Sequence, residues 1–129
     1  MKPWSDAWVL LAVGCRLSLD EISLRELIAT ADGIQHAVLT FDELDGGLTR
    51  LSSTGLLAVS DAGVGLTPAG LVLLSRTAAP RKSLLEWQDD LERALTFSAA
   101  DRAATRPGSA MVSVITRAEY EEALRRSGR

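Results

Sequence analysis

The sequence predicts a mostly helical protein with one small β-hairpin, which is an α+β fold, and three observations support this class. Four segments begin with Ser or Thr and carry Glu three residues later, a capping box that is typical of a helix start. Apolar residues in these segments recur at intervals of three and four, as on one face of a helix. Residues 56–66 hold two short apolar runs around Asp-Ala-Gly, a pattern that indicates a hairpin.

Length and composition indicate one globular domain with an appended element. The chain has 129 residues, of which 47% are hydrophobic and 24% charged, as in ordinary globular proteins. The net charge is −3, so the chain has no general electrostatic attraction to nucleic acid or to an anionic membrane. We expect a domain at residues 5–78 and a C-terminal extension at residues 79–129 that serves packing or dimerisation.

The first part of the domain predicts three helices. Each has a hydroxyl residue at its start and an apolar stripe with helical spacing. The second helix is expected to stop at Asp32-Gly33, because glycine commonly follows the last turn of a helix. The expected ranges are residues 5–15, 23–31 and 40–54.

Two adjacent glycines, Gly46 and Gly47, lie in the interior of the third helix. Each costs about 1 kcal/mol of helix stability relative to alanine. We therefore expect either a close approach by a neighbouring helix or a locally weak helix at this point.

The hairpin is predicted from a strand at residues 56–60, a turn, and a return strand at residues 64–66. Thr67 and Pro68 then begin a fourth helix, since Thr is a good cap and Pro is tolerated at the first helical position.

The C-terminal extension predicts a helix at residues 83–95, a short strand at 111–115 and a helix at 116–126. We expect the first of these helices, through Trp87, to pack on the first helix of the domain or on a second subunit. The strand is expected to pair with a sheet edge of the same chain or of the partner.

Three segments resemble a known family. They are Ser-Leu-Arg-Glu-Leu-Ile at 23–28, Thr-Phe-Asp-Glu-Leu at 40–44, and Gly-Leu-Thr-Pro-Ala-Gly at 65–70 after the hairpin. Together they resemble the bacterial winged-helix transcription regulators of the multiple-antibiotic-resistance and phenolic-acid regulator type. The resemblance implies a winged helix-turn-helix with a C-terminal helical extension, a homodimer, and DNA as the partner.

In such regulators the second helix of the helix-turn-helix lies in the major groove and its exposed side chains read base edges. The resemblance therefore implies that Thr49 and Arg50 contact bases and that Arg25 contacts phosphate.

An acidic surface is the alternative interpretation of the same helix. Asp42, Glu43 and Asp45 lie on its expected outward face, and no Lys or Arg occurs in residues 51–75, which include the hairpin. Carboxylates repel phosphates, whereas they attract a basic protein. The alternative is thus a winged-helix protein-interaction module that does not bind DNA.

The residue inventory favours a non-enzymatic protein without metal or cofactor. His36 is the only histidine and Cys15 the only cysteine, so neither has a companion with metal-ligand spacing. No nucleophile–base motif and no phosphate-binding glycine loop occurs. We expect His36 to stabilise the turn and Cys15 to fill the core as a small hydrophobe.

The N-terminal segment lacks the features of a signal peptide, and no apolar stretch approaches the roughly 18 residues that a membrane-spanning helix needs. Together with the single cysteine, these features lead us to expect a cytoplasmic protein.

Overall fold

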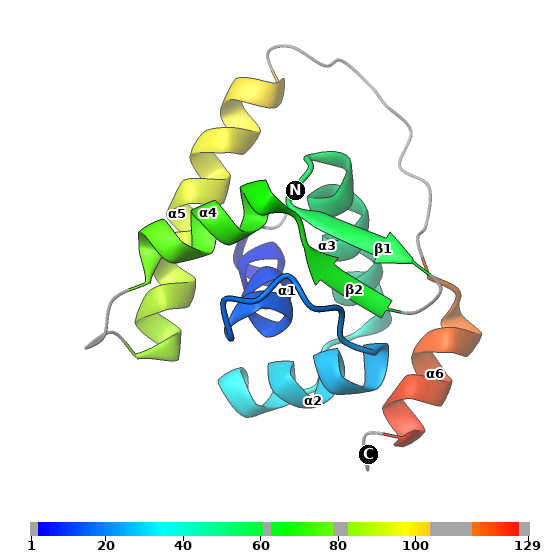
Figure 1. The fold of residues 1–129 in the computed structure, drawn as a ribbon. Helices are drawn as coiled ribbons and strands as arrows, with labels where there is room; N and C mark the ends of the chain where they lie inside the picture. The colour runs from blue at the N-terminus through cyan, green and yellow to red at the C-terminus, as the bar shows by residue number, and fades with distance from the viewer. Residues whose placement is uncertain (1–2, 61–62, 79–82, 104–114, 127–129) are drawn as a thin grey trace.

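The computed structural model describes residues 3–60, 63–78, 83–103 and 115–126. Within these ranges the chain forms six helices and one two-stranded antiparallel sheet, which confirms the α+β class (Figure 1). The elements are α1 (Pro3–Gly14), α2 (Leu24–Gln35), α3 (Phe41–Ser53), β1 (Leu57–Ser60), β2 (Gly63–Leu66), α4 (Pro68–Thr77), α5 (Leu84–Ala103) and α6 (Arg117–Arg126).

Helix α1 is the centre of the molecule. Helices α2, α3, α4 and α5 and strand β2 all contact it, and every residue from Ser5 to Val13 is buried. The predicted apolar stripe was therefore too narrow, because a helix surrounded on all sides is apolar around most of its circumference. The indole nitrogen of Trp8 donates a 2.8 Å hydrogen bond to the carbonyl of Ala31, which ties α1 to α2.

Helix α2 extends past its predicted end at Asp32-Gly33, so that prediction is wrong. The helix stops at His36, which adopts the left-handed conformation with φ 54° and ψ 38° and donates its backbone N–H to the carbonyl of Asp32. Histidine tolerates this conformation better than most residues other than glycine. His36 thus stabilises the turn into α3 through its backbone.

Helix α3 begins with the predicted capping box. The Thr40 hydroxyl accepts the backbone N–H of Glu43 at 3.1 Å, and the Glu43 carboxylate accepts that of Thr40 at 3.0 Å. The expected close approach also occurs, because a Cβ added at Gly47 would lie 2.9 Å from a methyl group of Val9 on α1. Glycine at this position lets α1 and α3 come together.

The hairpin pairs Leu57 with Leu66 and Ser60 with Gly63. A third segment joins it through Ile22, whose N–H and C=O both bond to Val64 at 2.8 Å. Helix α4 then starts at Pro68 as predicted, with the Thr67 hydroxyl accepting the N–H of Gly70.

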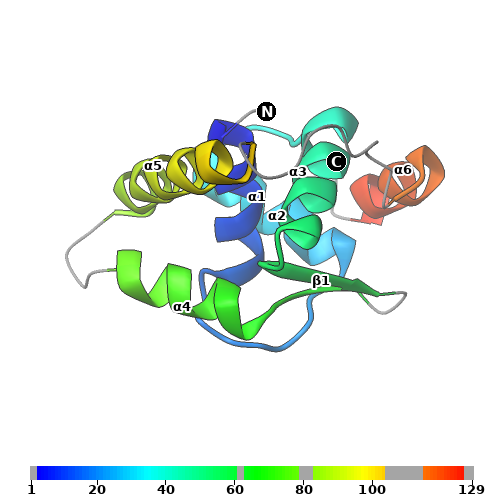
Figure 2. The same ribbon diagram turned by 90° about the horizontal axis from the view of Figure 1, so that it is seen from above.

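The two described helices of the C-terminal extension, α5 and α6, lie on opposite sides of the molecule (Figure 2). Helix α5 runs further than predicted and packs on α1, the first of the two places expected for it. Trp87 on α5 is buried and donates its indole N–H to the Thr77 hydroxyl at 2.9 Å. Helix α6 packs against α2 instead. Of the predicted strand at 111–115, residues 111–114 lie outside the described residues, and Ile115 forms a bend.

The contact at Gly47 predicts a difference between two Gly→Ala substitutions. Gly47→Ala forces its methyl group against Val9 and should lower the free energy of unfolding by about 1–3 kcal/mol. Gly33→Ala, in α2, meets nothing within 4 Å and should raise it by about 0.5–1 kcal/mol through helix propensity. Urea unfolding of both variants checks this, and equal shifts would contradict the close packing of α1 on α3.

Candidate functional site

Arg50, the only cation of α3, is paired with a buried carboxylate. Its guanidinium donates two hydrogen bonds to Asp6 on α1, at 2.6 and 2.7 Å, in a bidentate arrangement. The Asp6 side chain is 5% exposed and that of Arg50 is 17% exposed. Removing one partner of a buried ion pair typically costs about 3–5 kcal/mol, because the other charge is left buried without a counter-charge.

The pair has consequences for the charge on α3. The hydrogen bonds to Asp6 raise the pKa of Arg50 above its ordinary value, so the guanidinium stays charged at all working pH values. Gly46 leaves room for it, because a Cβ there would lie 3.0 Å from the guanidinium. Arg50 was expected on the outward face as a base-reading residue, and the structure instead turns it toward α1. Its charge is neutralised by Asp6.

The other two residues expected to contact DNA, Thr49 and Arg25, lie on different helices. The Thr49 hydroxyl donates a 2.7 Å hydrogen bond to the carbonyl of Asp45, one turn back in the same helix. Arg25 is exposed in the first turn of α2. Among the three, Arg25 alone has an exposed side chain.

The three acidic residues of α3 also have different environments. Asp42 is exposed, Glu43 is half-buried and closes the capping box with Thr40, and Asp45 is half-buried. A carboxylate oxygen of Asp45 accepts the backbone N–H of Ile115, just before α6, at 3.3 Å. They therefore do not form one exposed acidic face, because one is part of a cap and another contacts the C-terminal segment.

Helix α6 packs along α2 and also reaches the turn between α2 and α3 and the start of α3. We call this surface the α2–α3 corner and define it by Leu39, Phe41 and Asp45. The Tyr120 hydroxyl of α6 donates a 2.5 Å hydrogen bond to the Leu39 carbonyl. Its ring meets that of Phe41 edge to face, with centroids 5.8 Å apart and planes at 73°.

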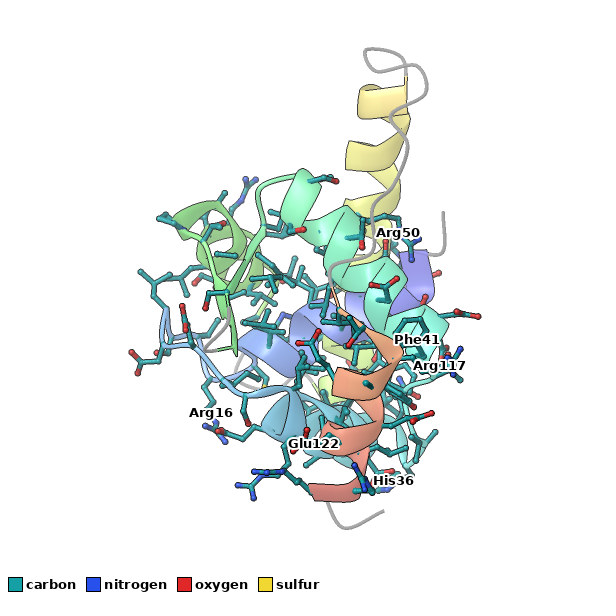
Figure 3. The ribbon with its side chains drawn as sticks, turned by 90° about the vertical axis from the view of Figure 1, so that its right-hand side faces the viewer. Arg16, His36, Phe41, Arg50, Arg117 and Glu122 are labelled. Atoms are coloured by element: carbon teal, nitrogen blue, oxygen red, sulfur yellow. The ribbon has the colours of Figure 1, made fainter. Side chains whose placement is uncertain are left out.

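A cation completes the contact at the corner. The Arg117 guanidinium lies over the Phe41 ring, 4.7 Å from its centroid, and Figure 3 shows the two side chains together beside α6. Such a contact contributes about 0.5–1 kcal/mol at an exposed site. The corner therefore receives α6 through a hydrogen bond, an aromatic pair and a cation–π contact.

An open groove of about 840 Å³ runs between the first turn of α2, the hairpin and α6. Its charged lining consists of two arginines, Arg25 and Arg126, and three carboxylates, Glu26, Glu119 and Glu122. Arg126 is 3.0 Å from Glu122 on the same helix. Because both signs are mixed here, the groove does not select an anion such as a nucleic-acid phosphate.

Sequence reasoning missed the contact between Tyr120 and the corner. The available signal was the apolar spacing of Tyr120, Ala123 and Leu124 on an otherwise charged helix. This spacing predicts one buried face, and the structure buries Tyr120 and Ala123 while Leu124 packs at the edge of the core. The sequence alone did not show which surface receives that face.

The described part of the chain contains no group of three or more His, Cys, Asp or Glu side chains that could hold a metal ion. Cys15 is half-buried beside the core, and burial raises the pKa of its thiol, with a smaller opposing effect of Arg16. The thiol is therefore protonated at neutral pH. No helix within residues 3–60, 63–78, 83–103 and 115–126 has the length and apolar character needed to cross a membrane.

No protein-family model, no curated relative and no solved structure matches this chain.

The environment of Tyr120 predicts a pH dependence of stability. Burial, and to a lesser extent the nearby Glu43 carboxylate, raise the pKa of Tyr120 above its ordinary value, while Arg117 lowers it. The folded protein thus favours the neutral phenol. The contribution of the neutral Tyr120 phenol to stability is complete below about pH 10, the pKa of an unfolded tyrosine. This contribution is lost as pH rises through the pKa of Tyr120 in the folded protein.

Tyr120 is the only tyrosine, so tyrosinate absorbance reports its ionisation directly. We expect a titration midpoint above that of the urea-unfolded chain and a loss of stability above about pH 10. In Tyr120→Phe this part of the pH dependence should disappear, with a loss of about 0.5–1.5 kcal/mol at neutral pH from the missing hydrogen bond. A wild-type midpoint equal to that of the unfolded chain would contradict the docking of Tyr120.

Proposed function

We propose that this protein is a non-enzymatic winged-helix protein-interaction module whose α2–α3 corner binds an amphipathic helix. The fold assignment is supported by the order of elements. Helices α2 and α3 are joined by a short turn, a hairpin follows α3, and Ile22 forms an isolated β-bridge with Val64 of that hairpin. Helix-turn-helix, sheet and wing occur in this order in winged-helix proteins.

The single observation that carries the function is the seating of α6 on the corner. In DNA-binding winged-helix proteins the second helix of the helix-turn-helix lies in the major groove, so the start and outer side of α3 correspond to the side that would face DNA. Here the same region holds a helix through Leu39, Phe41 and Asp45. A surface that satisfies a tyrosine hydroxyl and packs an aromatic ring has the features of a protein-binding site.

The distribution of charge supports a protein partner over DNA. Affinity for DNA depends largely on Lys and Arg that neutralise phosphates. Arg50 is paired with Asp6, the segment 51–75 contains no Lys or Arg, and Asp42 is exposed on α3. These features leave the described residues of α3 and the hairpin without an unpaired cation.

A dimeric DNA-binding transcription regulator is the second candidate. The winged-helix order of elements favours it, as does Arg25, which is exposed at the start of α2 where such proteins contact phosphate. The homodimer stays a prediction. Among the described residues, the exposed apolar side chains of Val72 on α4 and of Leu84 and Leu85 on α5 provide surface for it.

DNA binding distinguishes the two candidates. We expect no saturable binding of a fluorescent random-sequence duplex by the full chain in about 50 mM salt. At this low salt concentration even non-specific DNA-binding proteins bind, because their affinity rises as salt falls. The measurement is fluorescence anisotropy, repeated with the DNA that lies upstream of the protein's own coding sequence. Binding that weakens steeply with salt would favour the regulator. In that case Arg25→Ala should reduce the slope of log affinity against log salt concentration by about one, as expected for the loss of one phosphate contact.

A further inference from the structure

Helix α6 has the features of a self-contained ligand. Its first turn carries a capping box in which Thr116 and Glu119 satisfy each other's backbone N–H groups at 3.1 Å. Glu119 lies in its first turn and Arg125 and Arg126 in its last turn, as the helix dipole favours. A ten-residue helix is nevertheless marginal in water, so its helical state depends on what it packs against.

The contact of α6 with the rest of the protein is made by one narrow face. Tyr120 and Ala123 are buried, as is Ile115 just before the helix, whereas Ala118 and Glu122 are exposed on other sides. A face of this size gives a modest docking energy. A helix held in this way can be exchanged for another that presents the same side chains.

We propose that α6 is an internal ligand of the α2–α3 corner: the corner binds in trans an amphipathic helix with the residue pattern of α6, and α6 competes with that helix in cis. The proposal rests on the proposed function as a protein-interaction module, for which it names the partner and its regulation.

Two positions of the pattern follow from a contact and two from burial. The partner helix carries a cation, an aromatic hydroxyl three residues later, a small residue three further on, and Leu next to it, as Arg117, Tyr120, Ala123 and Leu124 do. The cation lies over Phe41, and the hydroxyl reaches a backbone carbonyl that no apolar ring can satisfy. The small residue lets the helix approach closely, since Ala123 is 7% exposed.

Competition in cis follows from the covalent link. A tethered ligand acts at an effective concentration of about 1 mM. If the untethered helix binds with a Kd of about 100 μM, occupancy by α6 weakens its apparent affinity about tenfold. A variant whose own α6 cannot dock should therefore bind the helix about tenfold more tightly than the wild type.

The test uses the full chain and a fluorescein-labelled peptide of residues 115–126. Ala123→Asp places a carboxylate on the docking face and should release α6, whereas Ala118→Asp places the same group on an exposed side and is the matched control. We expect anisotropy to show about tenfold tighter peptide binding by Ala123→Asp than by the wild type or Ala118→Asp. A second peptide with Ala at position 120 should not bind any of the three.

Circular dichroism establishes that the variants are folded, and Tyr120→Ala is a second release variant if Ala123→Asp unfolds. Equal peptide affinity in the wild type and the release variants would overturn competition by α6, and absence of binding to all would overturn the partner pattern. Neither result tests whether the protein binds DNA. The same release variants are titrated with duplex DNA, and salt-dependent binding by them would instead overturn the proposed function, because it would show that α6 masks a DNA-binding face.

Discussion

The buried ion pair between Asp6 and Arg50 is the interaction on which the arrangement of the helices and the character of the surface both depend. It joins α1, the central helix, to α3 through two short hydrogen bonds. The glycines at 46 and 47 make it possible, one by admitting the guanidinium and the other by letting α1 approach. The same pair neutralises the only positive charge of α3, so a structural requirement of the core affects what the helix can bind.

The α2–α3 corner gains its properties from this arrangement. With Arg50 turned inward, the start of α3 presents Phe41 and carboxylates, and these receive Arg117 and the backbone before α6. The open left-handed turn at His36 leads to Leu39, whose carbonyl is available to Tyr120. The surface is therefore complementary to a helix with one cation and one tyrosine, and it is poorly suited to a polyphosphate.

Local sequence signals predicted the helices and the hairpin, but they could not predict contacts between residues far apart in the sequence. The capping residues Ser23, Thr40 and Thr67 specify helix starts by contacts within four residues, so they could be read directly. The end of α2 was misjudged because Gly33 is tolerated inside the helix and His36 takes the left-handed position. Arg50 was assigned outward because helical periodicity cannot show that a carboxylate 44 positions earlier lies opposite it. The docking of α6 is likewise a contact across 81 positions.

The claim that the corner is a helix-binding surface is tested most directly by a double-mutant cycle between Phe41 and Tyr120. Each residue is replaced by Leu, singly and together, and the free energy of unfolding is measured in urea. Edge-to-face aromatic pairs contribute about 0.5–1.5 kcal/mol beyond their buried area, so we predict a coupling energy in this range. Additive effects, with a coupling below about 0.3 kcal/mol, would show that α6 does not rest on the corner in solution and would contradict the account.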